Sequence, residues 1–195
     1  MLQLFACLGF FALAFTDRTD AAPPVPDSVI WEEGIVYSTP DGESLALNMA
    51  RPRSDDGKQP AILCIHSGGF RAGKRESYDG LCVKLAEKGF VAATITYRLA
   101  PKYQFPAAVH DCKAAVRWLR ANAAKYSIDP TKIGITGGSA GGHLAQFLGV
   151  TAHVPEFEGT GGNPEQPSQA AVQKHELQSL LLTQKFGQPP SVGRC

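Results

Sequence analysis

The sequence predicts an α/β protein built on a mostly parallel, doubly wound sheet. Apolar strand-like runs alternate with helical patterns from residue 60 to residue 152, the order that right-handed crossovers produce. One run, residues 61–65, is apolar throughout, as in a strand buried on both faces. A glycine-rich turn at residues 137–142 joins another such run directly to a helical pattern. Together these features favour a parallel sheet with helices on both sides.

Composition limits the classes of protein to consider. The 195 residues are 44% hydrophobic and 19% charged, which fits one ordinary domain with a substantial core. Lys plus Arg number 19 against 18 Asp plus Glu, so the charge gives no reason to expect nucleic acid or an anionic membrane surface as a partner. No Cys or His spacing matches a metal site, and we expect no metal and no other cofactor.

Residues 1–22 are predicted to be a signal peptide. The apolar run over residues 4–15 is too short for a bilayer span, which needs about 20 residues, and the small Ala21 and Ala22 suit a cleavage site. We therefore expect export to the periplasm or beyond the cell, without a stable membrane span. No Lys or Arg precedes the apolar run, so a buried first helix or an N-terminal membrane anchor stays open as an alternative.

The five cysteines are Cys7, Cys64, Cys82, Cys112 and Cys195. Cys7 would leave with the signal peptide. Cys64 lies in an apolar strand pattern and Cys112 on a helix face, so both are expected to be small buried hydrophobic residues. An exported chain could oxidise a pair such as Cys82 and Cys112, and the sequence leaves that state open.

The elements follow in chain order. Residues 31–38 and 44–50 alternate well enough to be two strands, joined by a turn at residues 39–42, which predicts an antiparallel hairpin. Residues 61–65 then form the buried central strand. Two helices and two further strands are expected after it: a helix at 78–88, a strand at 90–97, a helix at 106–126 and a strand at 132–136.

The helix predicted at residues 106–126 has one apolar face. That face should pack on the sheet. We expect the polar side chains elsewhere on the helix to be solvated: His110, Lys113, Arg117 and Arg120.

The turn at residues 137–142 has the G-x-S-x-G pattern of a nucleophile elbow. In such an elbow the serine has a strained backbone conformation, and its neighbours must be small because strand and helix come into near contact. Gly137 and Gly141 supply that room around Ser139. The alternative is an ordinary glycine-rich turn with an incidental serine. The strand before the turn and the helix after it favour the elbow.

Three motifs at strand ends resemble the α/β-hydrolase fold: HSGGF at residues 66–70, YRLAPKYQFPAAVHD at 97–111 and GGSAGGHLA at 137–145. Within that fold they are most similar to hormone-sensitive-lipase-like and acetyl-xylan or feruloyl esterase-like carboxylesterases. The resemblance covers residues 31–165. It implies a serine hydrolase of carboxylic esters, on small molecules or linked to polysaccharide, that acts through an acyl-enzyme on Ser139.

Backbone N–H groups would stabilise the charge on the ester oxygen during attack, each donor contributing about 3 to 4 kcal/mol. Gly68 and Gly69 allow side-chain-free approach, and the resemblance pairs them with the N–H of Ala140. Ser67 stands where the family's H-G-G-G motif has a glycine. We expect His66 to position the loop rather than to act as the base.

Arg98 and Asp111 also match positions of the resembling family. We expect a structural role for each, as an ion pair or on a solvated face, rather than a catalytic one. The helix that begins at Ala140 would direct its positive end toward the developing charge.

The base of the triad is the missing part. In this fold an acid and then a histidine follow the serine, yet no Asp follows Ser139. The remaining acids and histidines are Glu156, Glu158, Glu165, Glu176, His143, His153 and His175. None has the separate late-loop placement that a triad needs, and in the resembling family both groups lie farther downstream than this chain extends.

Residues 23–167 are therefore expected to be the N-terminal part of an α/β-hydrolase domain, and residues 168–195 a divergent tail, helical or disordered. The hypothesis is a sheet truncated after the nucleophile helix, with a frameshifted or foreign tail. A genuine short variant would leave the strand before Ser139 at a sheet edge. Functionally, an exported esterase competes with a non-catalytic fragment or pseudoenzyme that binds a ligand or a partner. A peptidase is disfavoured because Ala140 follows the serine.

Overall fold

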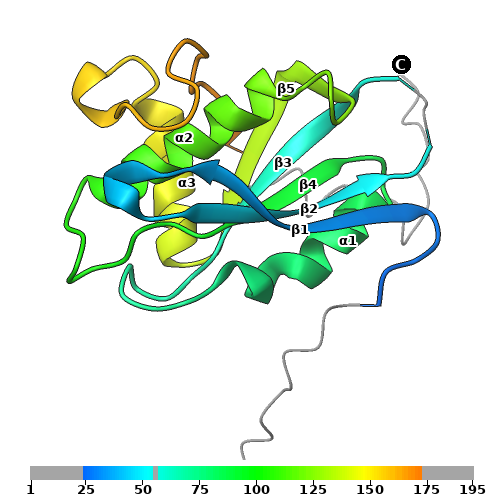
Figure 1. The fold of residues 1–195 in the computed structure, drawn as a ribbon, viewed down its shortest axis with the longest axis horizontal. Coiled ribbons are helices and arrows are strands. Elements are labelled where there is room, and N and C mark those ends of the chain that lie inside the picture. Colours follow the sequence, from blue (N-terminus) through cyan, green and yellow to red (C-terminus); the bar gives the residue numbers. More distant parts are fainter. Residues whose placement is uncertain (1–23, 55–56, 173–195) are drawn as a thin grey trace, which may run out of the picture.

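A computed structural model describes residues 24–54 and 57–172 of the chain. It shows one six-stranded sheet in the order β1-β2-β4-β3-β5-β6, with helices on both faces (Figure 1). The predicted signal peptide and the residues beyond 172 lie outside this described part. The α/β fold class predicted from the sequence is confirmed.

The strands are β1 (Val29–Ser38), β2 (Leu45–Pro52), β3 (Gln59–Ile65), β4 (Val91–Ile95), β5 (Ile128–Gly137) and β6 (Ala171–Val172). The first pair is the predicted antiparallel hairpin, whose connection contains the short 3₁₀ turn Pro40–Gly42. β2 also runs antiparallel to β4. From β4 through β3 and β5 to β6 every pairing is parallel, so all four carboxyl ends lie at one edge of the sheet.

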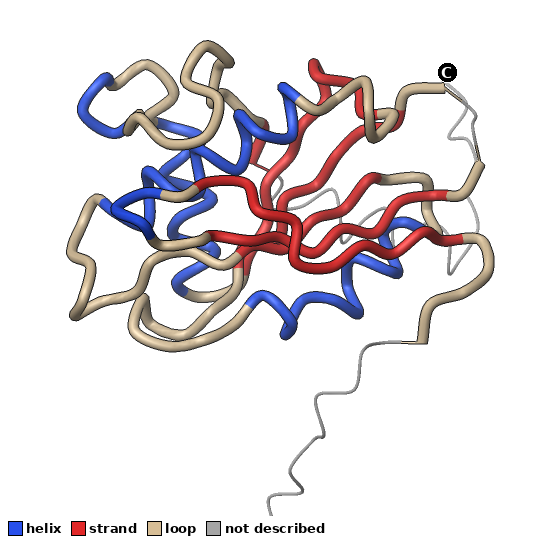
Figure 2. Tube along the Cα trace, viewed as in Figure 1, coloured by secondary structure: helices blue, strands red, loops and turns tan. Residues whose placement is uncertain are grey.

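Three α-helices cover the sheet: α1 (Asp79–Ala86), α2 (Ala107–Ala121) and α3 (Ala140–Val150). Figure 2 shows α1 on one side of the strands and α2 and α3 on the other. Alternate residues of β3 divide between these two layers. Leu63 belongs to the core under α2 and α3, whereas Ile62 and Cys64 belong to the core under α1. The continuous apolar run thus has the physical cause predicted for it, burial on both faces.

Cys64, Cys82 and Cys112 are buried free thiols. The expectation that Cys64 and Cys112 are buried hydrophobic residues is confirmed. Cys82 packs in the core under α1 and Cys112 in the core under α2. The sheet therefore separates these two thiols, and the disulfide considered between them cannot form in this fold.

The expectation of a solvated face on α2 is wrong for two of its cations. Lys113 is 0% exposed and Arg117 is 2% exposed, because the chain after α3 folds back over them. Both bind the carboxylate of Glu158, at 2.6 Å for Lys113 Nζ and 3.2 Å for Arg117 Nη1. They also donate to the backbone carbonyls of Thr151 and Gly161. Pairing and hydrogen bonds offset only part of the desolvation of Arg117, because burial still lowers its pKa and its buried Nε has no hydrogen-bond partner among the described residues. The contacts of both cations nevertheless attach α2 to the loop between α3 and β6.

The segment predicted as a helical or disordered tail begins as a strand. Ala171 pairs with Gly134 and Val172 with Ile135, so β5 has a parallel neighbour on each side at this level. Arg120, also expected to be solvated, donates to the carbonyl of Gln169 over 2.7 Å and to that of Pro167. The helix-like spacing noted at residues 177–186 lies outside the described residues.

Candidate active site

Ser139 occupies the turn between the end of β5 and the start of α3. Its φ of 49° and ψ of −118° are unfavourable for a residue with a side chain. The side chain is exposed at the carboxyl edge of the sheet. The strand–turn–helix context required for an elbow is therefore present around this serine.

The glycines of the turn are required by close backbone contacts. A Cβ on Gly137 would lie 2.6 Å from the carbonyl oxygen of Ile65, and a Cβ on Gly141 would lie 2.0 Å from the same atom. Real Cβ atoms do not approach this closely, so a side chain at either position would push β3, β5 and α3 apart. Gly137 and Gly141 thus leave the space predicted for them, and the carbonyl of Ile65 at the end of β3 lies in it.

The loop after β3 lies directly beside this turn, because Ile65 and Gly137 are register partners at the ends of adjacent parallel strands. Gly68 has a φ of +121°, and a Cβ there would lie 1.9 Å from the carbonyl oxygen of Ala72. The carbonyl of Gly68 accepts hydrogen bonds from the N–H groups of Arg71 and Ala72. Gly68 therefore shapes a tight turn that only glycine fits.

His66 holds this loop in place through buried contacts. Its ring is buried, stacks on Tyr97 at a centroid distance of 4.2 Å, and donates from Nδ1 to the carbonyl of Ser67 over 2.7 Å. The hydroxyl of Tyr97 donates to the carbonyl of His66. Burial lowers the pKa of His66, which favours the neutral ring. These contacts support the positioning role expected for His66.

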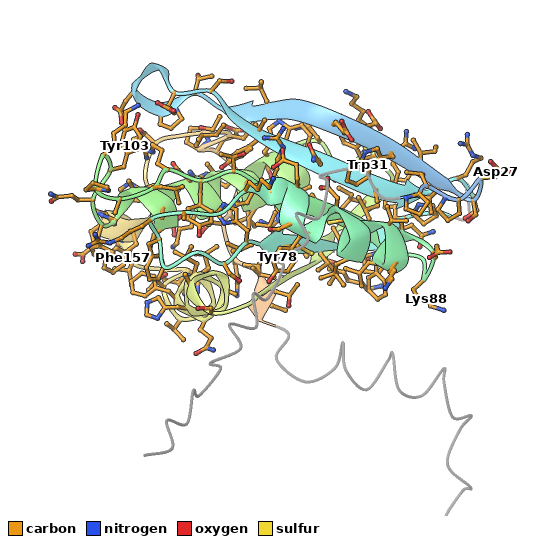
Figure 3. All side chains as sticks on the ribbon, turned by 90° about the horizontal axis from the view of Figure 1, so that it is seen from below. Asp27, Trp31, Tyr78, Lys88, Tyr103 and Phe157 are labelled. Atoms are coloured by element: carbon orange, nitrogen blue, oxygen red, sulfur yellow. The ribbon has the colours of Figure 1, made fainter. Side chains whose placement is uncertain are left out.

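Two side chains of the segment after β3 hold Gly138, the residue before the serine. The hydroxyl of Ser67 donates to the Gly138 carbonyl over 3.1 Å, and the Gly138 N–H donates to the hydroxyl of Tyr78 over 2.9 Å. Tyr78 ends the 3₁₀ turn Arg75–Tyr78, beside the start of α1 (Figure 3). Sequence reasoning missed Tyr78, since it belongs to none of the three motifs.

The N–H groups of Gly68, Gly69 and Ala140 donate to no protein acceptor in the described part of the chain. Ala140 is the first residue of α3, where a helix leaves its N–H groups unpaired. The positive end of that helix faces the same turn. The structure thus brings the predicted donors to the neighbouring strand ends that carry Ser139.

Arg98 and Asp111 form the ion pair expected as one of their structural roles. The backbone N–H and Nε of Arg98 donate to the Asp111 carboxylate over 2.8 and 3.0 Å. Arg98 Nη1 also binds Asp41 in the connection between β1 and β2. Asp111 is only 2% exposed, which excludes the solvated-face alternative for it. This ion pair ties the start of α2 to the chain that leaves β4.

No described residue is placed as the base for Ser139. His143 and His153 are exposed, and the ring of His143 lies against Phe70 and Phe147. Glu158 is bound to Lys113 and Arg117. Within residues 24–54 and 57–172, no histidine side chain is hydrogen-bonded to a carboxylate. His175 and Glu176 lie outside that part.

A pocket of about 340 Å³ opens beside the candidate site, between the loop after β3, the chain from β4 to α2, and α3. Gly69, Phe105, His143 and Phe147 are among its lining residues. A larger hollow of about 720 Å³ lies near the amino-terminal parts of β3 and β5 and contains none of the candidate residues. The smaller pocket is therefore the one that could receive a group attached to an ester at Ser139.

The described residues contain no cluster of three or more His, Cys, Asp or Glu side chains arranged to hold a metal ion. Among the same residues, no helix has the length and apolar character needed to cross a bilayer.

The known proteins to which this chain is similar include several esterases. The BD-FAE family model matches residues 47–181. Ethyl acetate hydrolase of Pseudomonas putida is 39% identical over 114 residues, covering 57% of this chain and 36% of that protein. Neutral cholesterol ester hydrolase 1 of Bos taurus is 38% identical over 114 residues, covering 56% of this chain and 28% of that protein.

Two solved structures share the architecture. A truncated form of a carbohydrate esterase from gut microbiota superposes with a TM-score of 0.67 and 32% identity, covering 76% of this chain and 57% of that one. A thermophilic esterase of Thermogutta terrifontis superposes with a TM-score of 0.63 and 32% identity, covering 74% and 51%. The chain thus spans 36% or less of the two curated relatives and little more than half of these structures.

Proposed function

The chain belongs to the BD-FAE family and has the α/β-hydrolase fold of carboxylesterases, and on this premise we propose that Ser139 is the nucleophile of a carboxylic-ester hydrolase. One observation carries the proposal. The strained, exposed Ser139 stands beside three backbone N–H groups, of Gly68, Gly69 and Ala140, that have no protein acceptor in the described chain.

The proposed reaction uses these groups in two steps. Ser139 Oγ attacks the carbonyl carbon of the ester, and the displaced electron pair moves to the carbonyl oxygen. The N–H groups of Gly69 and Ala140, with Gly68 beside them, donate to that oxygen. Expulsion of the alcohol leaves an acyl group on Ser139. Attack by water then releases the carboxylic acid and restores the serine.

Both steps also need a proton acceptor, and the proposal assigns that role to no described residue. An oxyanion site and substrate binding without acid and base still leave about 10³- to 10⁴-fold acceleration over water. The expected rate of this chain therefore spans a wide range. It depends on whether a group outside the described residues reaches Ser139.

One relative is named as an ethyl acetate hydrolase, which supports esters of a small acyl group, and one structural neighbour is a carbohydrate esterase. We propose small-molecule or polysaccharide-linked esters as substrates of this chain. Export through residues 1–22 stays a prediction from the sequence.

A second candidate function is a non-catalytic domain that binds an ester or a partner without turning it over. The absence of a histidine–carboxylate hydrogen bond in the described part favours it. Hydrolysis of p-nitrophenyl acetate by the purified chain and by its Ser139→Ala variant distinguishes the two candidates. The esterase proposal predicts a rate that Ser139→Ala removes. Equal rates in both proteins would contradict it.

A further inference from the structure

Asn48 is a buried amide in the layer of side chains that packs under α1. It is 1% exposed, and Ala50, the next residue of β2 on the same face of the sheet, belongs to the apolar core there. A buried amide without hydrogen-bond partners destabilises a fold, so the partners of this side chain show what it does.

The oxygen and the nitrogen of the Asn48 amide both have partners. Its Oδ1 accepts hydrogen bonds from the backbone N–H of Gly34 over 3.1 Å and from Arg75 Nε over 2.8 Å. Its Nδ2 donates to the two carboxylate oxygens of Asp79, over 3.0 and 3.3 Å. Since the oxygen faces two donors and the nitrogen faces a carboxylate, only one orientation of the amide fits. A carboxylate at this position would lack the donor, and an apolar side chain would lack both groups.

The two side-chain partners of Asn48 belong to one short segment. Arg75 begins the 3₁₀ turn Arg75–Tyr78, and Asp79 is the first residue of α1. Arg75 is also attached to β4, because its Nη1 donates to Thr96 Oγ1 over 3.0 Å and its carbonyl accepts from Thr94 Oγ1 over 2.9 Å. Burial raises the pKa of Asp79 to about 6, although the hydrogen bond from Asn48 acts in the opposite direction. The segment is therefore attached to the sheet at both of its ends.

Tyr78 lies between these two attachments. Its hydroxyl accepts the hydrogen bond from the N–H of Gly138, the residue before Ser139. A tyrosine side chain has only two χ angles, so the position of its hydroxyl follows closely from the backbone that carries it. The contacts of Asn48 thus lead through Tyr78 to the turn, although β4 and β3 separate β2 from β5 in the sheet.

We propose that Asn48 is a positioning residue for Ser139, which acts by fixing the segment 75–79 that carries Tyr78. The inference rests on the function proposed for Ser139 and extends its support to β2. Asn48 is buried beyond the reach of a substrate, so its effect on the reaction passes through the turn alone. A displacement of about 1 Å at a reacting group can lower a rate about 10²-fold, which makes such support matter.

Arg75→Met tests the segment first. The Arg75 side chain is 24% exposed, and the variant keeps an unbranched apolar stem while it removes the hydrogen bonds to Asn48 and Thr96. Arg51→Met is the matched control. Arg51 is 28% exposed and, like Arg75, binds a carboxylate over 3.2 Å, but its partner is Glu32 on β1.

Hydrogen exchange of the Gly138 amide, measured by NMR on the full chain, reports on the contact with Tyr78 without any catalysis. The measurements are made at about pH 7.5, where Asp79 is ionised. We expect exchange about five- to tenfold faster in Arg75→Met, the effect of one lost hydrogen bond, and a change of less than about twofold in Arg51→Met. Equal exchange in the two variants would overturn the proposal.

The amide itself is tested by exchanging the two side chains that it joins. Asn48→Asp leaves Asp79 without its donor and places a second carboxyl beside it, so Gly138 should exchange about five- to tenfold faster. Adding Asp79→Asn reverses the pair: the carboxylate on β2 accepts from Gly34 and Arg75, and the amide on α1 donates to it. The double variant should return to within about twofold of the wild-type rate.

A double variant that does not fold, or that exchanges as fast as Asn48→Asp, contradicts the proposal, and so does a single variant with wild-type exchange. If only the double variant folds and it protects Gly138, the proposal is supported.

Met49→Val separates this effect from a general loss of stability. Met49 is the next residue of β2 but lies in the core under α2 and α3. The change should lower the urea midpoint yet leave Gly138 exchange within about twofold, because the exchange depends on local opening at the turn. Exchange at Gly138 that simply follows the urea midpoint in every variant would make Asn48 a merely structural residue.

Hydrolysis distinguishes failure of this inference from failure of the proposed function. If the chain hydrolyses p-nitrophenyl acetate, Arg75→Met should lower kcat about ten- to hundredfold with KM within about twofold, because substrate contacts stay while the serine is misplaced. An active chain with equal kcat in Arg75→Met and Arg51→Met overturns the positioning of Ser139. An inactive chain whose Gly138 exchange depends on Arg75 and Asn48 overturns the proposed esterase and leaves the support of the turn standing.

Discussion

The hydroxyl of Tyr78 accepts a hydrogen bond from the backbone N–H of Gly138 over 2.9 Å. The two residues are 60 positions apart, yet this contact fixes the peptide group that leads into Ser139. Ser67 holds the carbonyl of the same glycine. Both contacts come from the segment between β3 and α1, so this segment supports the turn as well as providing proposed donors.

Tyr78→Phe should therefore destabilise the protein. The change leaves the Gly138 N–H without its acceptor in a partly buried place, and such a group costs about 1 to 3 kcal/mol. Urea denaturation measures the loss in free energy of unfolding. Tyr103→Phe is the control, because the hydroxyl of Tyr103 binds the exposed Glu43, which water can solvate in its absence. An equal loss in both variants would show that Gly138 does not depend on Tyr78.

Gly141→Ala should prevent normal packing of the turn. The added Cβ would lie 2.0 Å from the carbonyl oxygen of Ile65, and we expect destabilisation of about 3 kcal/mol or more. Gly80→Ala provides a control inside α1, where no atom lies within 4 Å of the new Cβ. That change should stabilise the helix by about 0.5 to 1 kcal/mol. Thermal unfolding should move in opposite directions for the two variants, and a similar shift in both would contradict the close contact.

Ser139→Gly should stabilise the chain relative to Ser139→Ala. Glycine adopts a φ near 49° without the strain of about 1 to 3 kcal/mol that other residues incur, although it loses more chain entropy on folding. The expected net gain is about 1 kcal/mol in the free energy of unfolding. Chemical denaturation of the two variants compares proteins that both lack the hydroxyl. A less stable glycine variant would mean that the backbone at this position is not strained.

Glu158→Gln should loosen the loop between α3 and β6. The carboxylate is the charged partner of buried Lys113 and Arg117, and breaking such a pair costs about 3 to 5 kcal/mol when it is fully buried. Since the Glu158 side chain is 31% exposed, solvent screening reduces the expected loss to about 1 to 3 kcal/mol. Glu165→Gln, at an exposed position of the same loop, should change stability by less than about 0.5 kcal/mol.

The effect of Glu158 should depend on pH. Burial alone would raise the pKa of this carboxyl, but hydrogen bonds from Lys113 and Ser168 and the nearby positive charges lower it overall. A pKa lowered on folding stabilises the protein above the unfolded value of about 4.3, and the contribution is lost as pH falls through the folded value. Wild type and Glu158→Gln should therefore converge in unfolding free energy as pH falls below about 4.3 and through the lowered folded pKa. A constant difference from pH 7 to pH 3 would contradict this ion pair.

The parts of the site that the sequence predicted are those that determine the residue type at their own position. Gly137, Gly141 and Gly68 are glycines because a Cβ would strike a nearby carbonyl, and a glycine beside a strand end signals such a contact. Burial of β3 on both faces likewise follows from its uninterrupted apolar run. These features are visible in the residue types themselves, although the groups that contact them, such as the Ile65 carbonyl, come from elsewhere in the chain.

The parts that the sequence did not predict depend on distant segments. The helical pattern of α2 distinguishes an apolar face from a polar one, but it does not show that the loop near Glu158 covers Lys113 and Arg117. The tyrosine at position 78 has no pattern that connects it to Gly138. The strand at Ala171–Val172 has only two residues, too few for an alternation to be recognised.

The pairing of Ile65 with Gly137 sets the register of β5 against β3. A slip of β5 by one residue along β3 would move Ser139 by about 3.3 Å and turn every side chain of the strand to the opposite face. Ile133 and Ile135 would then leave the core under α2 and α3, at a loss of about 1.5 to 3 kcal/mol for each buried side chain. Misalignment of the serine would therefore expose two buried isoleucines. The packing of the core thus fixes the position of Ser139 relative to β3.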